Sequence, residues 1–103
     1  MIFVIATSEL KPGFRNEFIS IVKENIPNVL AENGCISYTL TGDFDSDFAA
    51  QEKVGSDTLV FVECWESIDH LKAHLAAPHM QVFKEKVKDM RKSSTLKIMT
   101  PVC

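Results

Sequence analysis

Apolar residues recur along the chain in two distinct patterns, one typical of strands and the other of helices. Four short runs are rich in β-branched and aromatic residues, as expected of strands: residues 2–7, 35–41, 58–65 and 95–102. Between the first two runs, apolar residues repeat at helical spacing at Phe14, Phe18, Ile21, Val22 and Val29. A second helical pattern occupies the stretch between the third and fourth runs, with Leu71, Leu75, Val82, Phe83 and Val87.

Proline, glycine and capping residues punctuate these patterns. Pro12-Gly13 separates the first strand from the first helix, and Asn33-Gly34 supplies a left-handed stop after that helix. Pro27 lacks a backbone N–H and is expected to kink the helix or restart it. Ser67 is suited to cap the second helix, and Pro78 is expected to end it and open a third.

The resulting order, β-α-β-β-α-α-β, predicts an α+β fold of the ferredoxin-like type. We expect residues 1–103 to form one domain, with a four-stranded antiparallel sheet and its helices on one face. Residues 43–57 are polar and lack periodicity, so they are expected to form a surface loop between two strands. The first and third strands are apolar on both alternating faces, which predicts a homodimer in which a second copy covers the open face.

Composition narrows the possible functions and locations. A net charge of -3 and a pI of about 5.5 disfavour nucleic acid as a partner. No apolar run has the length that spans a bilayer, and three cysteines without a CxxC pair favour a reducing compartment. With no leader-like pattern among its first residues, the protein is expected to be cytoplasmic and away from membranes.

Two motifs carry a resemblance to a known family. Glu63-Cys64-Trp65 is followed by a helix with His74 and by His79 at the start of the next helix, and Gly34-Cys35-x-x-Tyr38 opens a strand. In these features the chain resembles the antibiotic biosynthesis monooxygenase family. The resemblance implies a dimeric α+β barrel and a cofactor-free enzyme that oxidises a quinol or polycyclic aromatic with dioxygen, using no flavin, haem or metal.

The same resemblance suggests roles for individual side chains. An electron-rich phenol reacts with dioxygen once it is deprotonated, which requires an aromatic-lined slot, a base and donors for an oxyanion. His74 or His79 is the candidate base, with Glu63 as the carboxylate that orients it, and Tyr38 is a candidate donor. Glu63, Trp65, His74 and His79 are expected to line one cavity between the sheet and the second and third helices. The aromatic walls are expected to come from Trp65, Phe14, Phe18 and Phe83.

Other interpretations of the same residues stay open. His74 could instead be a core histidine bonded to Glu63, His79 a helix cap, and Trp65 plain core. His70 and His74 share a helix face and could bind a metal with Glu63 or His79, but no HExxH stands here and we expect no metal. Two alternative functions also stay open. One is an isomerase or degradation enzyme for a signalling sugar on the same scaffold, in which Lys72 and Lys84 could bind a phosphate. The other is a non-catalytic module that binds an aromatic ligand.

Overall fold

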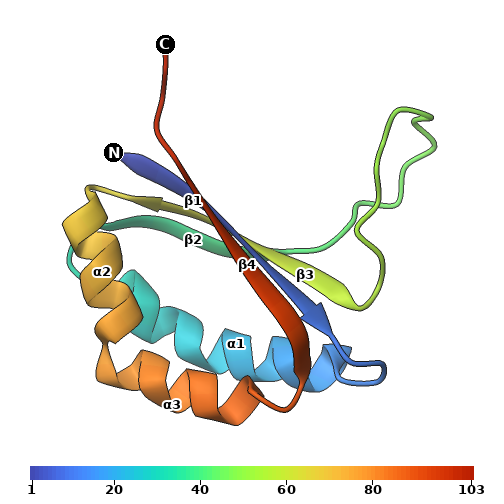
Figure 1. Cartoon of the computed structure of the whole chain (residues 1–103), viewed down its shortest axis with the longest axis horizontal. Helices are drawn as coiled ribbons and strands as arrows, with labels where there is room; N and C mark the ends of the chain where they lie inside the picture. Colours follow the sequence, from blue (N-terminus) through green and yellow to red (C-terminus); the bar gives the residue numbers. More distant parts are fainter.

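The computed structural model, which describes residues 1–103, has one four-stranded sheet with three helices packed on one of its faces (Figure 1). The strand order is β2-β3-β1-β4, and all three neighbouring pairs are antiparallel. The elements along the chain are β1 (Ile2–Leu10), α1 (Arg15–Leu30), β2 (Cys35–Thr41), β3 (Thr58–Trp65), α2 (Ile68–Ala76), α3 (Pro78–Val87) and β4 (Arg91–Met99). This confirms the predicted α+β ferredoxin-like class and element order.

Three local predictions were wrong. β1 continues to Leu10 and β4 begins at Arg91, because these two residues pair with each other at the end of the β1–β4 ladder. β4 therefore spans Arg91–Met99, where residues 95–102 were expected. α1 does not restart at Pro27 but runs through it to Leu30. Because Pro27 has no N–H, α1 lacks one backbone hydrogen bond at this point but continues for a further three residues.

The helix boundaries predicted at Gly34, Ser67 and Pro78 are found in the structure. The Ser67 side chain accepts a hydrogen bond from the backbone N–H of His70 and caps α2, and Pro78 occupies the first turn of α3. Gly34 has φ +83, a left-handed conformation that favours glycine. A Cβ on Gly34 would collide with the His70 ring, so this glycine also lets the turn after α1 approach the first turn of α2.

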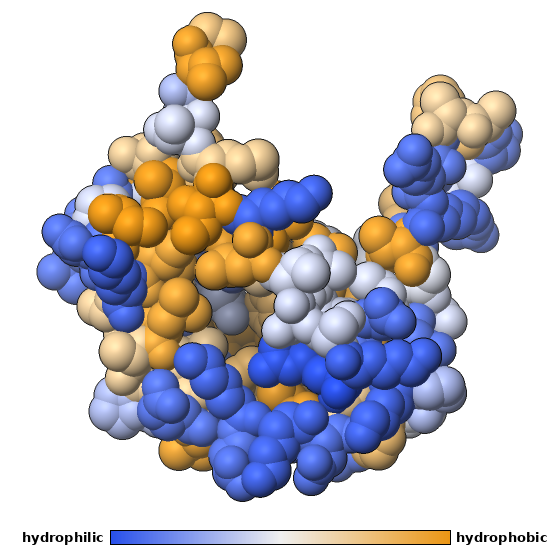
Figure 2. All heavy atoms as spheres, in the orientation of Figure 1, coloured by the Kyte–Doolittle hydropathy of each residue, from blue (hydrophilic) through white to orange (hydrophobic).

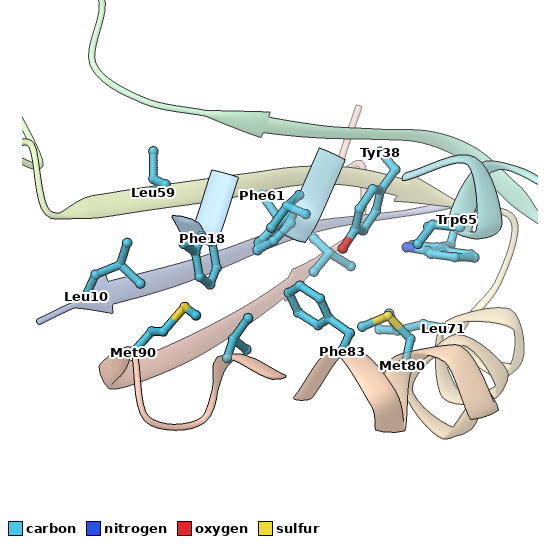
Figure 3. Close-up of a cluster of buried hydrophobic side chains, with 14 residues drawn as sticks. Leu10, Phe18, Tyr38, Leu59, Phe61, Trp65, Leu71, Met80, Phe83 and Met90 are labelled. Atoms are coloured by element: carbon cyan, nitrogen blue, oxygen red, sulfur yellow. The ribbon is translucent and has the colours of Figure 1, made fainter. Parts of the chain in front are cut away.

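The core fills the space between the sheet and the helices (Figure 3). Alternate residues of the central strands point toward the helices, including Val4 and Leu10 of β1 and Leu59 and Phe61 of β3. Aromatic rings dominate the centre of this core. Phe18 of α1 contacts Phe61 and Phe83 edge-on, with ring centroids 6.4 and 6.2 Å apart.

The opposite face of the sheet has no helix over it. Phe3 and Val62 point to this side and are 38% and 41% exposed. Apolar surface also gathers near the start of β1 and the end of β4 (Figure 2). On β4, Met99 pairs with Phe3 and shares the uncovered face, whereas Leu96 and Ile98 pair with Ala6 and Val4 on the helix-facing side; all three are nearly half exposed. None of the helices has the length and apolarity needed to cross a membrane.

The loop between β2 and β3 extends away from the body of the molecule as an arm (Figure 1). Its shape is held by local contacts: Asp43 accepts hydrogen bonds from the backbone N–H groups of Val54 and Gly55, and Lys53 pairs with Asp45. The predicted surface loop is confirmed, but it is less polar on its surface than the sequence pattern suggested. Phe44 and Phe48 are 80% and 78% exposed.

Candidate active site

A cavity of about 320 Å³ lies between the inner face of the sheet and helices α2 and α3. This volume is at the small end of the range for sites that take small molecules. Half of the lining residues are apolar, and the chemically distinctive members are Tyr38, Phe61, Glu63, His74, Phe83 and Arg91. Because these come from β2, β3, α2, α3 and β4, the cavity exists only where all of these elements meet.

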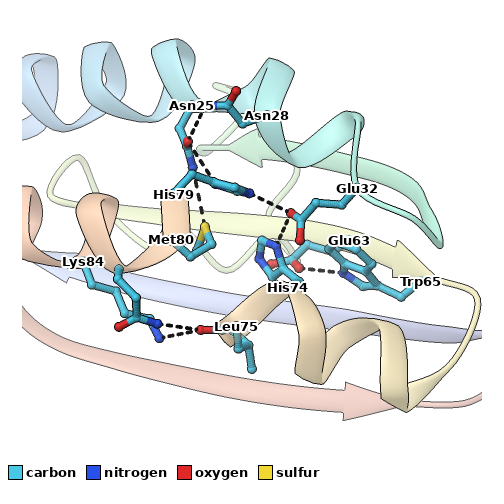
Figure 4. A network of polar contacts seen from close by, with 11 residues as sticks. Asn25, Asn28, Glu32, Glu63, Trp65, His74, Leu75, His79, Met80 and Lys84 are labelled. Atoms are coloured by element: carbon cyan, nitrogen blue, oxygen red, sulfur yellow. Dashed lines mark hydrogen bonds and ion pairs between the residues drawn. The ribbon is translucent and has the colours of Figure 1, made fainter. Parts of the chain in front are cut away.

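Glu63, Trp65 and His74 form a buried polar group beside this cavity (Figure 4). The indole Nε1–H of Trp65 donates to Glu63 Oε1 over 2.9 Å. Glu63 and Trp65 lie two apart on β3 and so share the inner face of the sheet. The Trp65 ring packs on His74, with centroids 4.6 Å apart, so Trp65 holds both the carboxylate and the imidazole in place.

Burial shifts the pKa values of Glu63 and His74, two of the ionisable groups that line the cavity. Desolvation raises the pKa of Glu63 to about 7, although the hydrogen bond from Trp65 favours the charged form. Desolvation also lowers the pKa of His74, and the neighbouring Glu32 opposes that shift only in part. His74 is therefore neutral near pH 7, with a free lone pair that can take a proton.

Tyr38 is placed as a hydrogen-bond donor on the same cavity wall. Its ring contacts His74 edge-on at 5.6 Å. Burial is the main cause that raises the pKa of its phenol, and the nearby Glu63 adds to the rise. The phenol therefore stays protonated at any pH at which the protein would work, and its O–H is available to an oxyanion.

Glu32 is the residue that sequence reasoning missed. Its Oε2 lies 2.7 Å from His74 Nδ1, whereas Glu63 was the expected partner of that histidine. The expectation failed because the Glu63 carboxylate is held by Trp65, while Glu32 reaches in from the turn after α1. Glu32 and His74 are 42 positions apart, so no local sequence signal links them.

His79 reaches the same carboxylate from α3 but does not line the cavity. Its Nε2 lies 3.3 Å from Glu32 Oε2, and its Nδ1 lies 3.2 Å from Asn25 Oδ1. It borders a separate groove of about 160 Å³ between α1 and α3. The four residues expected around one cavity are thus distributed differently: Glu63 and His74 line it, Trp65 lies behind them, and His79 lies on the far side of Glu32.

The predicted aromatic walls are also divided. Tyr38 and Phe83 line the cavity, as does Phe61, which the sequence reasoning did not single out. Phe18 is fully buried behind Phe61 and Phe83, and Phe14 lies at the N-cap of α1, packed against the core and outside the cavity. Helical periodicity identified both as inward-facing but could not say which inward-facing side chains border a void.

Arg91 places a positive charge on the cavity wall. Its guanidinium lies over the Phe83 ring at 5.9 Å and 3.4 Å from Ser8 Oγ, and no carboxylate lies within ion-pair distance of it. The run of basic residues from Lys84 to Lys92 is typical of a solvated helix face, but Arg91 begins β4 and turns toward the cavity. An unpaired cation beside aromatic rings is suited to hold a phenolate or another anionic group of a ligand.

The three histidines do not converge as a metal site would require. His70 bonds to the Ser67 hydroxyl at 2.7 Å, at the start of α2, whereas His74 and His79 meet at Glu32. No group of three histidine, cysteine or acidic side chains in the structure is arranged to hold a metal ion.

The sequence of the chain matches a known protein family. Residues 1–86 match the family model described as antibiotic biosynthesis monooxygenase. The chain belongs to this family. It is also 35% identical to "Probable quinol monooxygenase YgiN" of Escherichia coli K12, over 98% of each chain.

Solved structures of the antibiotic biosynthesis monooxygenase fold superimpose along the whole chain. One crystal structure of an antibiotic biosynthesis monooxygenase has a TM-score of 0.82 and 23% identity, and covers 100% of each chain. Rv0793 of Mycobacterium tuberculosis has a TM-score of 0.81 and 23% identity, with 99% of this chain and 95% of that one covered. PA3566 of Pseudomonas aeruginosa has a TM-score of 0.82 and 19% identity, with 99% and 94% covered. These likenesses support the fold.

Proposed function

We propose that the protein is a monooxygenase that oxidises a quinol or a polycyclic phenol with dioxygen in the cavity beside His74. The observation that carries this proposal is a neutral, buried histidine on the wall of an aromatic-lined cavity, held by a carboxylate through Nδ1. The relationship to YgiN, whose name describes a probable quinol monooxygenase, supports the choice of substrate class.

His74 is the proposed base in preference to His79. Its Nδ1 faces Glu32, so Nδ1 carries the proton and Nε2 is left with a free lone pair. Because the side chain lines the cavity, Nε2 is the atom that takes the proton from a substrate hydroxyl. His79 borders the other groove and does not reach the substrate.

The remaining polar groups would bind the substrate as its charge develops. Tyr38 O–H and Arg91 are the proposed donors to the phenolate oxygen, since both line the cavity and both carry protons at neutral pH. Glu63, with a pKa of about 7, is the proposed partner of a second hydroxyl, because it can donate or accept a hydrogen bond at that pH. Phe61 and Phe83 would enclose the rings.

The proposed reaction balances with dioxygen as the oxidant. A quinol O–H bond breaks as the His74 Nε2–H bond forms, and the electron-rich quinolate reduces dioxygen. One oxygen atom enters the ring and the other leaves as water, so that a quinol and O₂ give a hydroxyquinone and H₂O. The quinol itself supplies all four electrons that this reduction requires.

The apolar half of the cavity lining favours an aromatic substrate over a phosphorylated sugar. Lys72 does not line the cavity, and the Lys84 ammonium donates to the Leu75 carbonyl at its edge. A sugar would leave many hydroxyls facing Phe61, Leu71, Met80 and Phe83 without hydrogen-bond partners.

The test is oxygen consumption with 1,4-dihydroxynaphthalene as the probe, corrected for its uncatalysed oxidation. We compare the wild type with His74→Gln and with His70→Gln, a matched control one turn earlier on α2 that does not line the cavity. The expected result is a loss of about 100-fold or more in kcat for His74→Gln, with little change for His70→Gln. A folded His74→Gln protein with the wild-type rate would refute the proposed base. A wild type that binds the diol without turnover would point to the non-catalytic binding module.

A further inference from the structure

Two histidines on different helices approach the same carboxylate oxygen. His74 Nδ1 of α2 and His79 Nε2 of α3 lie 2.7 and 3.3 Å from Glu32 Oε2 (Figure 4). The Glu32 and His79 side chains are only 16% and 24% exposed, and that of His74 is 2% exposed. A carboxylate oxygen shared in this way is a path along which a proton can pass between the two rings.

The two ring nitrogens of His79 have different partners: Nδ1 faces Asn25 and Nε2 faces Glu32. Asn25 Oδ1 accepts from Asn28 Nδ2 and lies 3.2 Å from His79 Nδ1, so that Nδ1 carries a proton and donates it to this oxygen. Nε2 is left facing Glu32, buried and without an aligned hydrogen-bond partner. A bare lone pair on Nε2 would oppose the carboxylate lone pairs, so this geometry favours a proton between Nε2 and Glu32 Oε2.

The two ends of this chain of groups open to different spaces. His74 lines the cavity, whereas His79, Asn25 and Asn28 line the groove between α1 and α3. The groove is bordered by the charged side chains of Glu24 and Lys86, both on the surface of the molecule. Phe83 borders both the cavity and the groove, and Glu32 is the only carboxylate that both histidines contact.

We propose that His74, Glu32 and His79 form a proton relay that carries the proton taken from the substrate out of the cavity to solvent in the α1–α3 groove. This proposal rests on the proposed function, since it needs a reaction that delivers a proton to His74. It assigns Glu32 and His79 as positioning and relay residues, which do not touch the substrate.

Each transfer in the relay breaks one bond to hydrogen and forms another. The substrate O–H bond breaks and His74 Nε2–H forms; His74 Nδ1–H then passes its proton to Glu32 Oε2. The proton shared by Glu32 and His79 moves to His79 Nε2. His79 Nδ1–H, which at rest donates to Asn25 Oδ1, then leaves that oxygen and gives its proton to water in the groove. One proton enters at the cavity and one leaves at the groove, so His74 does not stay a cation beside the quinolate. The same path in reverse returns one proton for the water that forms, which restores the starting protonation of the three groups and leaves no net proton released.

The relay gives the enzyme a physical advantage over a lone histidine. A protonated His74 without an exit would be a buried cation, which desolvation disfavours. It would also remain paired with the quinolate and return the proton before dioxygen reacts. An exit through Glu32 and His79 removes the proton by a path that does not cross the substrate.

The experiment compares Glu32→Gln, His79→Gln and their combination with Glu24→Gln, using 1,4-dihydroxynaphthalene and oxygen consumption. The amide introduced by Glu32→Gln keeps an oxygen that accepts from His74 Nδ1–H but cannot pass a proton on. Glu24→Gln makes the same charge change on α1, at a residue that borders the groove outside the relay. Glu32→Asp is the conservative variant that keeps the carboxylate.

We expect Glu32→Gln and His79→Gln each to lower kcat about tenfold with little change in KM, less than the loss for His74→Gln. The combined variant should be no slower than either single variant. Glu32→Asp should be faster than Glu32→Gln. The solvent deuterium isotope effect on kcat should be larger in the two single variants than in the wild type. Glu24→Gln should behave as the wild type.

The outcomes separate the relay from the proposed function. A folded His79→Gln protein with wild-type kcat and isotope effect would overturn the relay and leave His74 as the base. Additive losses in the combined variant, or losses in KM alone, would also overturn it, because they indicate structural roles. A wild type without any diol oxidation would overturn the proposed function, and the relay with it.

Discussion

Replacing Glu63 by Gln should make the protein more stable at neutral pH, although it removes a carboxylate from the candidate active site. Glu63 is 5% exposed, and its one hydrogen-bond donor is Trp65. Burial raises its pKa from 4.5 to about 7 in the native state. The native protein therefore holds a proton on Glu63 over a pH range in which the unfolded chain has released it.

The sign and size of the effect follow from this difference. Between pH 4.5 and about 7 the native state binds one more proton than the unfolded state, so the free energy of unfolding falls as the pH rises. At about 1.4 kcal/mol for each pH unit, the loss across this range is about 3 kcal/mol. Below pH 4.5 and above about 7 this carboxyl adds no slope.

The assay is urea unfolding of the wild type and Glu63→Gln at a series of pH values from 4.5 to 8 and one protein concentration. The amide that replaces the carboxyl still offers an oxygen to Trp65 Nε1–H, so packing is kept. We expect equal stability at pH 4.5 and an advantage of about 3 kcal/mol for the variant at pH 8. Glu52→Gln, on the exposed arm, serves as the control and should run parallel to the wild type. If the Glu63→Gln and wild-type curves were parallel, the account of Glu63 as a buried, protonated carboxyl would be refuted.

Two further predictions concern the fold and the assembly. Gly34→Ala should lower the free energy of unfolding, measured by chemical denaturation, by about 2 kcal/mol or more, because φ is +83 and the new Cβ collides with His70. Gly13→Ala is the control: its φ is +91 but the space around it is open, so its loss of stability should be smaller. Equal costs would show that the His70 contact is unimportant. We also expect a homodimer through the uncovered sheet face, which Val62→Lys should convert to a monomer by light scattering, whereas Leu30→Lys on the helical side should not. A monomeric wild type at micromolar concentration would contradict this.

The fold could be predicted from the sequence because its signals are local. The strands at 35–41 and 58–65 have the predicted bounds, and Ser67 and Pro78 start α2 and α3 as capping and proline rules require. The start of β4 could not be found in this way, because residues 91–94 are polar and only their pairing with β1 makes them a strand. Pairing between distant segments is a tertiary effect that a window of sequence does not contain.

The site was predictable in its residue types but not in its connections. Glu63, Trp65 and His74 meet because strand alternation and the helix over the sheet place them together. Glu32 lies in a turn whose approach to α2 depends on Gly34, and nothing in its sequence neighbourhood indicates that a histidine 42 positions away will contact it. The division of His74 and His79 between two spaces follows from that single carboxylate.

The central claim is that the cavity beside His74 inserts oxygen from dioxygen into an aromatic substrate. Its most direct test is turnover of 1,4-dihydroxynaphthalene under ¹⁸O₂, quenched before carbonyl oxygens exchange with water and analysed by mass spectrometry. The account predicts a hydroxyquinone that carries one ¹⁸O atom, formed by the wild type and by His70→Gln but at least about 100-fold more slowly by His74→Gln. Oxidation to the unlabelled quinone, or labelled product at equal rates in the wild type and His74→Gln, would contradict it.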